Sequence, residues 1–208
     1  MNINKQKAAQ NELEALKALA NCGWMTTRLI ALWVWTESTQ HVAINKAQIL
    51  LKRLGARKQV LERETPIGMK AWILTDTGAK RVNAELEELG YSRGWAHHGY
   101  DLSTLHFQKQ ITIVEYLIEQ RKAGLAVVGK AGLRAGLLPE KFKDFDAVTV
   151  NFDSGYTKGV LVMALLSKSN AGRADALCSS FYNTGTVIGV PSRVKRFSTA
   201  ARTCNSAT

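Results

Sequence analysis

The sequence predicts an α+β protein, in which a helical amino-terminal half with one β-hairpin precedes a small α/β half. Three observations predict this fold class. Apolar residues recur at helical spacing through most of the first half. Strand-like residues surround a turn at residues 66–68, and short β-prone runs follow Gly124. With 208 residues, of which 46% are hydrophobic and 22% charged, the chain can bury a core and has room for two small domains.

Two helices are expected at the start of the chain. Leucines and alanines at helical spacing predict the first over residues 5–20, and residues 21–23 interrupt the pattern. The second is expected from Thr26 or Thr27 to Trp35, because a threonine hydroxyl accepts a hydrogen bond from a free amide of the first helical turn.

A third helix is expected from Ser38 or Thr39 to Leu54, with Gly55 as its end. One face of this helix is apolar and contains Ala43, Ala47, Leu50 and Leu54. The opposite face is polar and partly basic.

A hairpin and a fourth helix complete the first half. Residues 59–65 and 69–74 have strand character and flank the turn, and a helical pattern then runs from Thr77 to Gly90. The order helix, helix, helix, hairpin, helix is that of a winged helix-turn-helix domain.

That architecture predicts where DNA is bound. Its third helix enters the major groove, and its hairpin contacts the backbone or the minor groove beside it. Asn and Gln pair with adenine edges, whereas Lys and Arg bind guanine or phosphate. Winged helices also serve as protein-docking modules, and that alternative remains open. The candidate DNA-binding residues are His41, Asn45, Lys46 and Gln48 near the helix start, Lys52, Arg53, Arg57 and Lys58 near its end, and Arg63 and Lys70 beside the hairpin turn.

The charge balance favours a polyanionic partner. The chain carries 28 Lys and Arg against 17 Asp and Glu, a formal net charge of +11. The excess is spread over both halves, and residues 191–208 contain four basic residues and no acidic one. Charge alone does not distinguish nucleic acid from an anionic membrane.

No disulfide, metal site, cofactor or membrane partner is expected. Cys22, Cys178 and Cys204 lie far apart and lack the spacing of zinc ligands. The amino terminus lacks the apolar segment of a signal peptide, and no later run approaches the roughly 18 apolar residues of a membrane span. We therefore expect a cytoplasmic protein.

The second half predicts a small α/β domain after a linker. The expected domains are residues 1–91 for the winged helix, 92–100 for the linker, 101–198 for the α/β domain and 199–208 for a flexible tail. Within the α/β domain, helices are expected over residues 103–122 and 171–182, and strands over residues 148–152, 160–166 and 187–190.

Several segments of this half together resemble one family. They are Leu105-His106, Phe145-Asp146-Ala147-Val148, residues 160–169, Tyr182 and residues 187–192. They are similar to motifs of the plasmid replication-relaxation proteins, which include mobilisation proteins related to restriction-type nucleases. The resemblance covers nearly the whole chain and implies a winged helix followed by a PD-(D/E)xK-like domain.

The departures from the family bear on catalysis. A nuclease of this type needs two or more carboxylates to hold a divalent cation. If the domain is active, the resemblance makes Asp146 and Lys168 its site residues, but Val162 and Ala164 stand where the family has glutamates. We therefore expect a catalytically inactive scaffold with no metal. Alternatively, Glu115, Glu119 or Asp144 completes a site.

The sequence thus predicts a duplex-DNA-binding protein of plasmid or mobile-element type, expected to be a homodimer. It would act as an accessory factor in conjugative transfer or replication, beside other mobilisation or replication proteins, or as a transcriptional regulator. Two alternatives remain open. One is a metal-dependent DNA-nicking enzyme, and the other is a protein-interaction module of a larger nucleoprotein assembly.

Overall fold

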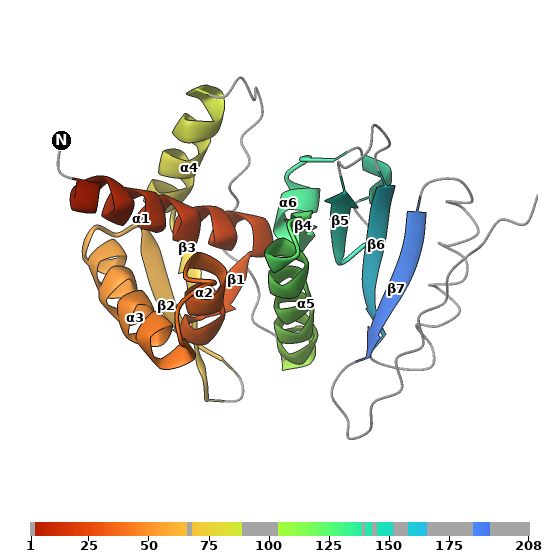
Figure 1. The fold of residues 1–208 in the computed structure, drawn as a ribbon, viewed down its shortest axis with the longest axis horizontal. Helices are drawn as coiled ribbons and strands as arrows, with labels where there is room; N and C mark the ends of the chain where they lie inside the picture. The colour runs from red at the N-terminus through yellow and green to blue at the C-terminus, as the bar shows by residue number, and fades with distance from the viewer. Residues whose placement is uncertain are drawn as a thin grey trace, which may run out of the picture.

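The chain is an α+β protein of helices and two small sheets (Figure 1). The computed structural model describes residues 3–65, 68–88, 104–138, 140–142, 145–151, 158–165 and 185–191. The helices are α1 (Ile3–Cys22), α2 (Thr27–Val34), α3 (Gln40–Ala56), α4 (Asp76–Glu88), α5 (Thr104–Lys122) and α6 (Lys130–Arg134), with a 3-10 turn at Glu140–Phe142. The strands are β1 (Trp24–Thr26), β2 (Val60–Glu64), β3 (Lys70–Leu74), β4 (Ala126–Gly129), β5 (Ala147–Asn151), β6 (Lys158–Leu165) and β7 (Gly185–Pro191).

The predicted helices of the first half are confirmed, and α2 begins as expected. The Thr26 hydroxyl accepts a hydrogen bond from the Leu29 amide at 3.4 Å, which satisfies one free donor of the first turn. Within the part of the chain that the structure describes, no helix combines the length and apolarity needed to cross a bilayer.

The end of α3 differs from the prediction, because the helix continues through Gly55 to Ala56. The Lys58 amide donates to Gly55 O at 2.9 Å, and the Gln59 amide donates to Leu54 O at 2.9 Å. Lys58 has φ +56°, so this is a Schellman motif with a lysine in the left-handed position that glycine usually occupies. The expected stop at Gly55 was therefore wrong.

The predicted hairpin belongs to a three-stranded antiparallel sheet of order β1-β3-β2. The short strand β1 was not predicted. One face of the sheet, which includes Met25 and Val60, joins the core between the helices. The other face packs on α5, where the rings of Trp24 and Phe107 stack with centroids 4.6 Å apart.

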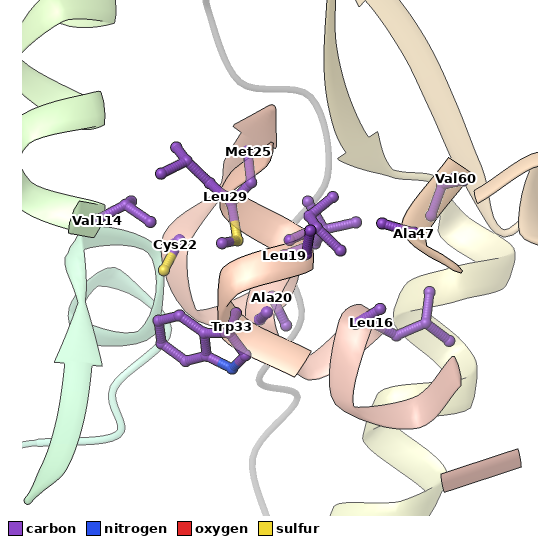
Figure 2. Close-up of a cluster of buried hydrophobic side chains, with 14 of the residues drawn as sticks. Leu16, Leu19, Ala20, Cys22, Met25, Leu29, Trp33, Ala47, Val60 and Val114 are labelled. Carbon is purple, nitrogen blue, oxygen red and sulfur yellow. The ribbon is translucent and has the colours of Figure 1, made fainter. Parts of the chain in front are cut away.

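The main core is continuous across the predicted domain boundary. It combines apolar residues of α1, α2, α3 and the first sheet with Val114 and Leu117 of α5 (Figure 2). Helix α5 therefore covers the core of the first half, although the sequence assigned it to the second domain. The predicted domain boundaries stay predictions, and the linker at 92–100 and the tail at 199–208 lie outside the described residues.

The second sheet has the order β4-β5-β6-β7, with β4, β5 and β6 antiparallel and β7 parallel to β6. Its edge strand β4 is joined to the end of α1 through one buried side chain. Asn21 donates from Nδ2 to Val127 O at 3.0 Å, and its Oδ1 accepts from the Gly129 amide at 2.8 Å. The predicted helix over residues 171–182 lies outside the described residues.

Candidate nucleic-acid interface

One face of α3 presents four of the predicted DNA-binding residues in a row, here called the polar stripe: His41, Asn45, Gln48 and Lys52. Their spacing of four, three and four residues places them on one side of an α-helix. All four are exposed, and the apolar face around Ala47 and Leu50 is buried as predicted. The core therefore fixes the helix with the polar stripe facing solvent.

A neighbouring flank of α3 forms one wall of a groove. The groove has a volume of about 520 Å³ and lies between α3, the amino-terminal part of α1 and the turn that joins α2 to α3. Lys46 Nζ donates to Ser38 Oγ at 3.3 Å within it, and Ile49 is 63% exposed. We call it the α1–α3 groove, and its lining includes Lys7, Asn11, Trp35, Lys46, Ile49 and Arg53.

Two of the candidate DNA-binding arginines, together with Arg81, surround a buried carboxylate. Glu12 of α1 is 5% exposed, and its oxygens lie 2.8 Å from Arg57, 3.4 Å from Arg81 and 3.7 Å from Arg53. This cluster was not anticipated. Arg53 and Arg57 remain about half exposed, and a guanidinium has five N–H donors, so pairing with Glu12 orients each one and leaves donors for a ligand.

The hairpin strands carry acids as well as the predicted cations Arg63 and Lys70. Lys70 Nζ lies 2.8 Å from Glu62 Oε1, and this hydrogen bond raises the pKa of Lys70. Arg63 is exposed, but it lies between Glu62 and Glu64 on β2. The two predicted cations of the hairpin are thus balanced by two carboxylates.

The remaining predicted contact is Lys58, which is exposed in the turn after α3. The structure brings α3, this turn and the hairpin together on one part of the molecule, since β2 follows the turn and packs against α3.

The catalytic candidates that the structure describes, Asp146, Glu115 and Glu119, each pair with a different cation. Asp146 is 5% exposed and its Oδ1 lies 2.6 Å from Lys109 Nζ, so an ammonium group pairs with this carboxylate. Glu115 pairs with Arg28, and Glu119 lies 3.2 Å from Lys122. In the described ranges, no three His, Cys, Asp or Glu side chains form a group that could hold a metal.

The nuclease hypothesis also involved Lys168, Asp144 and Val162. Lys168 and Asp144 fall outside the described residues. Val162 lies on β6, in register with Ala147 on β5, which follows Asp146 directly.

Cys22 is buried, and burial raises the pKa of its thiol to about 12.

We expect no divalent-metal-dependent cleavage of DNA by the purified protein. A metal at Asp146 would have to displace Lys109 from a buried carboxylate, and among the described residues no group of three His, Cys, Asp or Glu side chains is present to replace its water ligands. Supercoiled plasmid incubated with magnesium or manganese should stay supercoiled. Nicking that disappears in both Asp146→Ala and Lys168→Ala would contradict this expectation.

Comparisons with family models, curated proteins and solved structures gave no match.

Proposed function

We propose that the first half of the chain and α5 form a winged helix-turn-helix unit that binds duplex DNA. We further propose that the protein is an accessory factor for plasmid transfer or replication, or a transcriptional regulator. The α/β half would then be a nuclease-like scaffold without catalytic function.

The observation that carries this proposal is the polar stripe of α3. An α-helix with its side chains is about 10–12 Å wide, and the major groove is about 12 Å wide, so α3 can enter it. The stripe would then face the base edges with Asn45 and Gln48, whose amides match the donor and acceptor pattern of adenine. The net charge of +11 supports a polyanionic ligand.

Two further features support DNA over a protein partner. The centre of the stripe is polar, whereas protein-binding surfaces concentrate aromatic and aliphatic side chains at their centre. The hairpin lies alongside α3, as a winged helix requires for contact with the adjacent backbone (Figure 1). If the protein is a homodimer, as we propose, two copies of α3 would read half-sites about 34–36 Å apart.

Selection from a pool of randomised duplexes tests the proposal. We expect enrichment of one sequence, and if the protein is a dimer, two related half-sites. A pool that remains random after repeated rounds at moderate salt would contradict sequence recognition, and absence of any duplex binding would contradict the function.

Substitution of Asn45 tests the polar stripe itself. Asn45→Ala should weaken binding to the selected duplex by about 1–3 kcal/mol, because a base contact is lost, and should change binding to random duplex much less. Fluorescence anisotropy with both duplexes measures the two affinities. Equal losses on both would mean that Asn45 contacts phosphate and does not read a base.

A further inference from the structure

We propose that the α1–α3 groove, and not the hairpin, makes the main contact with the DNA backbone. This inference rests on the proposed function and adds a second binding surface, which includes Lys7 of α1. The groove would bind the sugar-phosphate backbone of one DNA strand. This is the strand next to the flank of α3 opposite the hairpin.

The position of the groove follows from the packing around α3. Because the helix and the major groove have similar widths, an inserted helix faces one sugar-phosphate strand on each flank. The β2–β3 hairpin packs along one flank, where Gly55 lies close to Trp72. The other flank, with Lys46, Ile49 and Arg53, lines the groove beside α1.

The charges of the two flanks differ. The groove is lined by three cations, Lys7, Lys46 and Arg53, and by one acid, Glu37. The hairpin carries equal numbers of cations and acids, whereas the groove keeps an excess of cations even when Glu12, which lies 3.7 Å from Arg53, is counted with Glu37. Since counterion release scales with the number of phosphates neutralised, the groove should contribute more to affinity than the hairpin.

The groove also holds its cations in place. Lys46 is hydrogen bonded to Ser38, and Arg53 lies 3.7 Å from the buried Glu12. Both side chains are therefore partly ordered before a ligand arrives, which reduces the entropy lost on binding. Asn11 and Ser38 add polar groups of the kind that bind phosphate oxygens in protein–DNA complexes.

The test is the salt dependence of duplex binding. The wild-type protein is compared with Lys7→Gln, Lys46→Gln and Lys70→Gln, each of which removes one charge. Lys80→Gln is the matched control, because Lys80 is exposed on α4, outside both flanks of α3. Anisotropy with a labelled random duplex at several salt concentrations gives the slope of log Kobs against log [salt] for each variant.

We expect Lys7→Gln and Lys46→Gln each to reduce the magnitude of this slope by about 0.9, the value for one phosphate contact. Lys70→Gln should reduce it clearly less, and Lys80→Gln should leave it unchanged. Unchanged slopes for both groove variants, in a wild type that binds duplex, would overturn this inference and leave the proposed function standing. An equal loss for Lys70→Gln would also overturn it, and a wild type that binds no duplex would overturn both proposals.

Discussion

Replacement of Gly78 by alanine should lower the free energy of unfolding by about 3–4 kcal/mol, at or above the upper end of the range for overpacked sites. Gly78 lies in the first turn of α4, where alanine would ordinarily be the better helix former. A Cβ atom at this position, however, would lie 2.1 Å from the backbone oxygen of Gln59 and 2.9 Å from Leu74 Cδ2. The steric cost therefore outweighs the gain in helix propensity.

The backbone at Gln59 has little freedom to move away. Its amide donates to Leu54 O at 2.9 Å in the Schellman motif, and its oxygen accepts from the Thr75 amide at 3.2 Å. The Thr75 hydroxyl in turn donates to Lys58 O and accepts from the Gly78 amide. A shift that made room for the new methyl group would break bonds that end α3 and start α4.

Gly55→Ala is the matched control, since it places the same methyl group in another helix. There the nearest atom to the new Cβ is Trp72 Cζ3 at 3.9 Å, an ordinary contact, so the variant should gain up to about 1 kcal/mol. Urea denaturation followed by circular dichroism measures both effects. A midpoint of unfolding for Gly78→Ala at or above that of the wild type would contradict the prediction, whereas failure to fold would agree with it.

Local sequence pattern was sufficient to predict much of the fold. The helices α1 to α5 follow from apolar spacing, because burial of one face imposes the helical period on the sequence. The hairpin follows from its turn residues, and the cap of α2 follows from the chemistry of Thr26. The polar stripe of α3 could be predicted for the same reason, since it is the face left over when the apolar face is buried.

Features set by contacts between distant residues could not be predicted in this way. Strand β1 has only three residues and is a strand because β3 pairs with it. The left-handed Lys58 ends α3 because the following backbone is held by other elements, although nothing in its side chain favours that conformation. The acids that partner the predicted cations come from other elements, as Glu12 does for Arg57, or from across the hairpin, as Glu62 does for Lys70.

The sequence therefore predicted which residues of the candidate site are exposed and polar or basic, but not which of them are available to contact DNA. Counting cations identified α3 and the hairpin as basic, but the acids of the hairpin balance its cations, whereas the α1–α3 groove has more cations than acids. Lys7 was not considered, because no local pattern connects the start of α1 with the middle of α3. The nuclease-like interpretation of the second half stays a prediction.

The junction between the first half and the second sheet depends on Asn21. This side chain is 6% exposed and bonds to two backbone groups of β4, the Val127 carbonyl and the Gly129 amide. The contact is close, because a Cβ atom at Gly129 would lie 2.7 Å from Asn21 O, and one at Gly132 would lie 2.6 Å from Asn21 Oδ1. Glycines at both positions allow the end of α1 to approach β4 and α6.

Asn21→Ala should therefore lower the free energy of unfolding by roughly 2–4 kcal/mol, because the buried Gly129 amide would lose its partner at a cost of about 1–3 kcal/mol and the part-buried Val127 carbonyl would lose its partner at a smaller cost. Asn45→Ala, on the exposed face of α3, is the matched control and should change stability by less than about 0.5 kcal/mol. Hydrogen exchange provides a local measurement, since the Gly129 amide should exchange faster in Asn21→Ala, whereas amides of α3 should change only as far as global stability does. Equal stability of the two variants, together with unchanged protection of the Gly129 amide, would show that apolar packing of α5 holds the two parts together without this polar contact.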